Sequence, residues 1–122
     1  MALKYLLDED LRGPLWNAVV RHNSRGGDML DTLRVGDRPA PPLKTLDPQL
    51  LVWAQNHERI LVTFDKSTMR THFREHLKAG RASPGVFQIK PRSNIAAVVE
   101  YLVLAAYASD PGEWRNECWF IP

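Results

Sequence analysis

Four aspartates of this sequence stand next to apolar segments, where their types and spacing suggest a bound cation. Asp8 follows the apolar run KYLL and Asp10 lies two residues further on, while Asp65 follows ILVTF and Asp47 opens DPQLLVWAQNHE. Carboxylates crowded at a strand end repel one another, so an ordinary surface turn gains little from them. Oxygen ligands without cysteine or a required histidine select Mg²⁺ or Mn²⁺ rather than zinc.

A metal ion held by carboxylates indicates phosphoryl transfer or phosphodiester hydrolysis. The ion lowers the pKa of its bound water and offsets charge on the transition state. Thr63 and Ser67 are candidates for orienting a water or a phosphate, although hydroxyls beside an acid are common. For Asp47 the role of a helix cap stays open as well, because Asp-Pro is a common start of a helix.

The elements that must position these acids alternate between strand and helix. Such alternation predicts an α/β fold with a mostly parallel, roughly five-stranded sheet, helices on both faces and right-handed crossovers. Sites in such sheets form beyond the carboxyl ends of the strands, near the switch point, and this is where the acids fall. Strands are expected at 4–7, 28–35, 59–64, 86–90 and 113–121, and helices at 14–23, 47–58, 68–80 and from Ser93 as cap to 109.

Length and composition limit the class of protein. A chain of 122 residues predicts one domain over 1–122, and the net charge of +2 does not by itself indicate a nucleic-acid partner. The single cysteine, Cys118, excludes an internal disulfide. The apolar stretch 95–108 is too short to span a bilayer, and the acids at 8–10 do not fit a signal peptide. We therefore expect a cytoplasmic protein with no membrane partner.

Three segments together resemble a known family. The start LLDED, the centre LDPQLLVWAQNHERILVTFD and the late strand PGVFQIKP are similar to the small bacterial PIN-like proteins of the DUF5615 group, with the consensus LLDENLP…SDxEIxxxAxxxxRILVTxDxDF. The resemblance covers most of the chain and is weakest at 36–46 and over the last fifteen residues.

The resemblance implies a three-layer αβα PIN-like fold and a Mg²⁺- or Mn²⁺-dependent ribonuclease, because PIN domains are metal-dependent ribonucleases. Many of them are toxins of toxin–antitoxin pairs. It implies catalytic and metal-binding roles for Asp8, Asp47 and Asp65. Asp10, also a metal-ligand candidate, stands where the family usually has Asn. Where the family has a further acid after Asp65, this chain has Ser67. That departure leaves open a weak nuclease, a single-metal nuclease or a member that only binds.

Basic side chains near the acids are candidates for RNA phosphates. They are Arg12, the loop residues Arg34, Arg38 and Lys44, and Lys66, with Ser67 beside them. A helical stripe of Arg70, Arg74, Lys78 and Arg81 is either a further phosphate contact or a solvated helix face. A small antitoxin is a possible partner, and the final WRNECWFIP offers an edge for a homodimer.

Two other enzyme classes have weaker sequence support. DEDL fits the D-x-D of haloacid-dehalogenase-like phosphatases, but the later paired acids of that class are absent where PRSN follows VFQIK. HFREH at 72–76 matches H-x-x-E-H of one zinc protease class, which needs a further ligand and a larger scaffold. The non-enzyme alternative is a PIN-like scaffold that binds RNA or a protein partner.

Overall fold

The computed structural model describes residues 2–11 and 13–122, which form five strands, a short 3₁₀ helix and five α-helices. The strands are β1 (Lys4–Leu7), β2 (Asp31–Arg34), β3 (Ile60–Phe64), β4 (Val86–Ile89) and β5 (Cys118–Ile121). The 3₁₀ helix is Glu9–Leu11, and the α-helices are α1 (Pro14–Ser24), α2 (Asp47–Asn56), α3 (Ser67–Lys78), α4 (Ile95–Ala108) and α5 (Pro111–Trp114).

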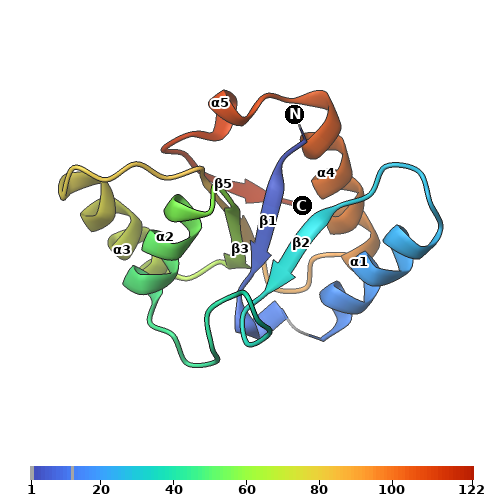
Figure 1. Ribbon diagram of the computed structural model, residues 1–122, viewed down its shortest axis with the longest axis horizontal. Helices are drawn as coiled ribbons and strands as arrows, with labels where there is room; N and C mark the ends of the chain where they lie inside the picture. Colours follow the sequence, from blue (N-terminus) through green and yellow to red (C-terminus); the bar gives the residue numbers. More distant parts are fainter. Residues whose placement is uncertain (1, 12) are drawn as a thin grey trace.

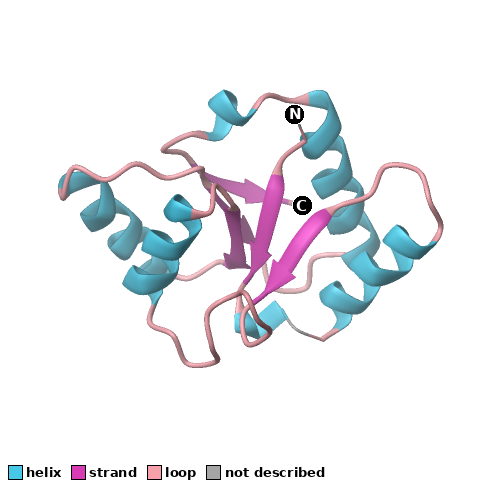
Figure 2. Ribbon diagram, in the orientation of Figure 1, coloured by secondary structure: helices cyan, strands magenta, loops and turns pink. Residues whose placement is uncertain are grey.

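All five strands are parallel, in the order β2-β1-β3-β4-β5. The sheet stands between two layers of helices, as Figure 2 shows. The expected three-layer α/β architecture is therefore confirmed. The chain continues from β1 to β2, on one side of β1, and then crosses to β3 on its other side. The direction of strand addition therefore reverses, and the switch point lies between β1 and β3.

Each face of the sheet has its own apolar core, because successive strand side chains point to opposite faces. Tyr5 and Leu7 pack with α1 and α4, whereas Leu6 and Leu61 pack with α2 and α3. In Figure 1, α2 and α3 lie to the left of the sheet and α1 and α4 to the right. The Tyr5 hydroxyl also donates a hydrogen bond to the Leu102 carbonyl of α4, at 2.7 Å.

One crossover departs from the expected handedness. The steps β2 to β3 and β3 to β4 run in the same direction across the sheet and use α2 and α3 on one face. The step β4 to β5 runs in that direction too, yet its helix α4 lies on the opposite face, with α1. The α4 crossover therefore has the opposite hand, and the expectation that all crossovers are right-handed is wrong. The apolar face of α4 fills the core beside α1, and the connection 109–117 brings the chain back.

Several expected boundaries are corrected by local chemistry. Asn94, not Ser93, caps α4, because its Oδ1 accepts from the Ala97 N–H at 3.1 Å. The Ser93 hydroxyl donates instead to the Lys90 carbonyl. The expected strand 113–121 begins only at Cys118, since the preceding residues form α5 and a turn. The strand expected over 28–35 is confined to Asp31–Arg34.

The proline-rich loop 36–46 is anchored at two places. The Gly36 N–H donates to the Pro41 carbonyl at 2.7 Å, and Ala40 and Pro41 are buried, so part of the loop packs into the protein. The Lys44 N–H donates to Glu9 Oε1 at 2.7 Å. Glu9 thus ties this loop to the segment that carries Asp8 and Asp10. Of the helices described, none is long and apolar enough to cross a membrane.

Candidate functional site

Asp8 is a buried carboxylate at the end of β1. Its N–H donates to the Val62 carbonyl at 2.9 Å, so the backbone continues the pairing of β1 with β3. One carboxylate oxygen accepts from the Thr63 hydroxyl at 2.8 Å, and the other accepts from the Glu9 N–H at 2.7 Å. Only 4% of the residue is exposed. The neighbouring strand therefore supplies the main side-chain partner of this acid.

The pKa of Asp8 is raised above its ordinary value, chiefly because burial disfavours the charged form. The hydrogen bonds from Thr63 and Glu9 and the positive charge of Lys66 oppose that rise. The negative charge of Asp47, the first residue of α2, adds to it. Asp8 is accordingly held in an environment in which a full negative charge is costly.

Lys66 provides the positive charge of this group. Its Nζ donates to Asp10 Oδ2 at 2.8 Å, and this bond is the largest cause of its raised pKa. Burial opposes the rise, and the charges of Asp8, Asp10 and Asp47 all add to it. We call Asp8, Asp10, Asp47 and Lys66 the acidic centre. It joins the ends of β1 and β3 to the start of α2, at the switch point of the sheet.

Asp65 belongs to a different group. Its N–H donates to the Ile89 carbonyl of β4 at 2.8 Å, and its carboxylate accepts from the Arg70 guanidinium at 2.5 Å. The charges of both residues reach the thiol of Cys118 on β5, whose pKa is raised mainly by burial. The pair with Arg70 thus draws Asp65 toward α3 and β5. Both side chains are partly exposed, at 42% for Arg70 and 32% for Asp65.

Cations of the protein already lie beside the four aspartates. The oxygen ligands have suitable chemistry, but the ammonium of Lys66 interacts with three of the four carboxylates and Arg70 pairs with the fourth. Within residues 2–11 and 13–122, no three Asp, Glu, His or Cys side chains are grouped so that they could hold a metal ion. The metal site expected from sequence therefore stays a prediction. In the structure Lys66 contacts Asp10, and Arg70 contacts Asp65.

The capping role considered for Asp47 is not seen. Leu46 occupies the N-cap position of α2, no side chain makes a capping hydrogen bond there, and Asp47 is already the first helical residue. A carboxylate in the first turn interacts favourably with the helix dipole. Its interaction with Lys66 adds a long-range role that capping does not explain.

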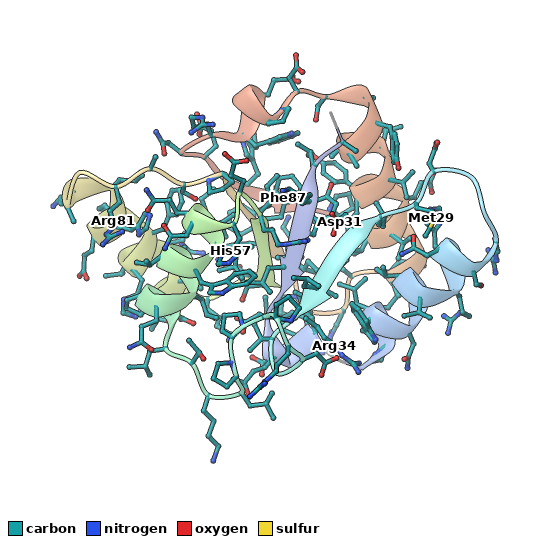
Figure 3. The ribbon with its side chains drawn as sticks, viewed as in Figure 1. Met29, Asp31, Arg34, His57, Arg81 and Phe87 are labelled. Atoms are coloured by element: carbon teal, nitrogen blue, oxygen red, sulfur yellow. The ribbon has the colours of Figure 1, made fainter. Side chains whose placement is uncertain are left out.

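Within the part of the chain that the structure describes, the expected phosphate ligands are spread over the carboxyl edge of the sheet. Arg34 donates to Asp37, and its guanidinium lies 4.6 Å from the centre of the Trp16 ring. Figure 3 shows Arg34 at the end of β2, beside loop 36–46. Arg38 and Lys44 are exposed on that loop. Ser67, the first residue of α3, is exposed as well, and Arg12 lies outside the described residues.

The structure separates the residues of the basic stripe. Arg70 pairs with Asp65, whereas Arg74 and Lys78 are exposed on α3 and Arg81 is exposed just after it. In the H-x-x-E-H segment, His76 is buried and its Nε2 lies 2.7 Å from the Ala82 carbonyl oxygen, as a donor would. This contact leaves that nitrogen unable to bind zinc. The phosphatase hypothesis gains no support either, since Asp8 is buried.

Sequence reasoning missed three residues that shape this edge. Gln88 is fully buried on β4, where its amide nitrogen contacts the Lys66 carbonyl oxygen at 3.4 Å and its Oε1 contacts the Cys118 sulfur at 3.4 Å. Lys90, which directly follows β4, and Phe120 of β5 lie close together at the same edge of the sheet. The only sequence signal was a polar residue inside the apolar run VFQI, because an exposed Lys and Phe carry no pattern of their own.

A small hollow of about 180 Å³ at this edge is lined by Asp10, Lys90 and Arg92 together with mostly apolar residues. A larger one, of about 500 Å³, lies between α1 and α4 and contains none of the four aspartates. The carboxyl edge is thus better suited to an extended ligand lying across it than to a small molecule enclosed in a pocket.

Comparisons with known proteins add no relative. No family model, no curated protein and no solved structure matches this chain.

Proposed function

We propose that this protein is a PIN-like domain that binds single-stranded RNA along the carboxyl edge of its sheet, without a resident metal ion. The observation that carries the proposal is the position of Lys66, bonded to Asp10 and interacting with Asp8 and Asp47. Uncompensated carboxylates would repel a phosphate backbone. With Lys66 and Arg70 as their partners, the acids contribute much less repulsion.

Exposed cations on neighbouring loops support binding of a phosphate backbone. Arg38 and Lys44 lie on the loop after β2, and Lys90 and Arg92 follow β4. They flank the acidic centre from both sides of the switch point. Phosphate contacts of this kind are strongly dependent on salt, and a net charge of +2 adds little long-range attraction. The choice of RNA as the ligand rests on these cations and on the resemblance to PIN-like proteins.

A metal-dependent ribonuclease, using Mg²⁺ or Mn²⁺, is the second candidate. It is favoured by the convergence of Asp8 and Asp10 with Asp47, 37 residues later in the chain than Asp10, at one switch point. It requires Lys66 to leave the acidic centre. A role as the toxin of a toxin–antitoxin pair, with a small protein inhibitor, rests on the family resemblance alone.

One experiment separates the two candidates. A labelled mixed-sequence single-stranded RNA is incubated with the protein in Mg²⁺, Mn²⁺ or EDTA, and binding and cleavage are measured on the same samples. The variants are Asp8→Asn, which alters the acidic centre, and Asp65→Asn, which alters the other group. We expect binding that persists in EDTA, weakens as salt rises and is not followed by cutting.

Metal-dependent cutting that is lost in the variants would overturn the proposal in favour of the ribonuclease. Absence of both binding and cutting would contradict both candidates. A homodimer, also considered from the sequence, is checked on the same samples by analytical ultracentrifugation.

A further inference from the structure

An exposed aromatic ring lies near two cations at the end of β5. Phe120 is 48% exposed, and its ring centre lies 5.8 Å from the guanidinium carbon of Arg70 and 5.9 Å from the ammonium of Lys90. We call Phe120, Arg70 and Lys90 the aromatic patch. Single exposed hydrophobic residues are common on protein surfaces, but proteins that bind single-stranded nucleic acid combine exposed rings with nearby cations.

The fold explains why this ring is open to solvent. β5 is an edge strand of the sheet, and its side chains alternate between the two faces. Ile121 is buried in the core formed with α1 and α4, and Cys118 packs against the core formed with α2 and α3. Phe120 shares the face of Cys118 but lies at the far end of the strand, opposite Gln88 of β4. Half of its surface therefore remains exposed.

The aromatic patch is continuous with the carboxyl edge that carries the acidic centre. Arg70 is held by Asp65, which directly follows β3, and Lys90 directly follows β4. Asp65 is also next in sequence to Lys66 of the acidic centre. The ends of three adjacent strands thus carry the Asp65–Arg70 ion pair, the ammonium of Lys90 and the Phe120 ring.

We propose that Phe120 is a stacking platform for one base of single-stranded RNA, with Lys90 and Arg70 contacting the adjoining phosphates. The inference rests on the proposed function and adds a specific subsite to it. Stacking on an aromatic side chain tolerates any base, because every base has a π face. The two cations attract the backbone that carries the base. The platform would hold the strand beside the acidic centre without selecting its sequence.

The chain offers a matched control for this subsite. Trp119 is the preceding residue of β5, is also 48% exposed, and points to the other face, where its ring centre lies 6.0 Å from that of Trp114. Binding of a fluorescent single-stranded RNA of mixed sequence is measured by anisotropy for the wild type, Phe120→Ala, Phe120→Trp and Trp119→Ala. Thermal unfolding of each variant confirms that it is folded.

We expect Phe120→Ala to bind about tenfold more weakly. Phe120→Trp should retain the affinity of the wild type, and Trp119→Ala should leave it unchanged. A second series uses RNA in which base-free sugars replace every nucleoside. The wild type should lose affinity for this RNA, whereas Phe120→Ala should lose much less, because it has already lost the stacking contact.

Other results would overturn the inference. If the wild type binds RNA and Phe120→Ala binds equally well, the platform is absent while the proposed function stands. Equal losses in Phe120→Ala and Trp119→Ala would indicate a general effect on β5. If sedimentation shows a dimer that Phe120→Ala dissociates, the patch is an interface between two copies. If the wild type binds no RNA, the proposed function fails, and the platform fails with it.

Discussion

Asp8 and Asp65 end neighbouring parallel strands after similar apolar runs, yet the fold gives them opposite surroundings. Asp8 is buried and accepts hydrogen bonds from the Thr63 hydroxyl and the Glu9 N–H. Asp65 is partly exposed and is paired with Arg70. The same sequence signal thus produces one acid with a costly charge and one with a compensated charge. The difference is set by the elements packed over each strand end.

Removing the principal side-chain partner of each acid should give the largest difference in the free energy of unfolding. Thr63→Val deletes the hydroxyl that donates to the buried carboxylate of Asp8, and a hydrogen bond to a charged group contributes about 2 kcal/mol. Arg70→Met deletes the exposed partner of Asp65 and should cost about 1 kcal/mol or less. Urea denaturation at pH 7 measures both free energies of unfolding. Equal losses would mean that the two sites do not differ as described.

A smaller effect is expected from removing the cation of the acidic centre. Lys66→Met leaves three carboxylates without their common partner and should lower the free energy of unfolding in EDTA by about 1 kcal/mol. Millimolar Mn²⁺ should then stabilise this variant, because ligands that bind the folded state raise its stability. Thermal unfolding with and without Mn²⁺ measures the effect.

The wild type and Arg70→Met are the controls for the manganese experiment. Neither should respond to Mn²⁺, since both retain Lys66 among the acids. Equal stabilisation of the wild type and Lys66→Met would show that Lys66 does not compete with a metal ion. That outcome would favour the ribonuclease.

The smallest effect concerns pH. The pKa of Asp8 is raised in the folded protein above the ordinary value of 3.8, so the folded state takes up this proton before the unfolded state does. Asp8 therefore makes the protein more stable as the pH falls through its folded-state pKa, and the gain is complete below 3.8. Asp8→Asn should lack this gain. The difference in unfolding free energy between the two proteins, measured from pH 7 to pH 3, checks the sign, and a wild type that loses stability relative to Asp8→Asn on acidification would contradict it.

The core of the fold was predictable because its signals are local. Alternating apolar strands and helices indicated the parallel sheet, and the short run KYLL before Asp8 placed that acid at a strand end. The inward positions Leu50, Leu51 and Ala54 of α2 follow helical spacing and are buried as expected. By contrast, Val20 lies at an apolar position of α1 yet is 47% exposed, whereas its neighbour Val19 is buried.

The sequence by itself determined that acids gather at one edge of a parallel sheet. Apolar periodicity decides where each strand ends, and the carboxyl ends of parallel strands meet at one edge. Only the tertiary structure decided which cations meet them. Lys66 and Asp10 are 56 residues apart, and their contact depends on the packing of β3 beside β1. Likewise, the face chosen by α4 and the exposure of Phe120 follow from which surfaces are already covered. Spacing along a chain carries local geometry, whereas the partner of a charged side chain is set by long-range packing.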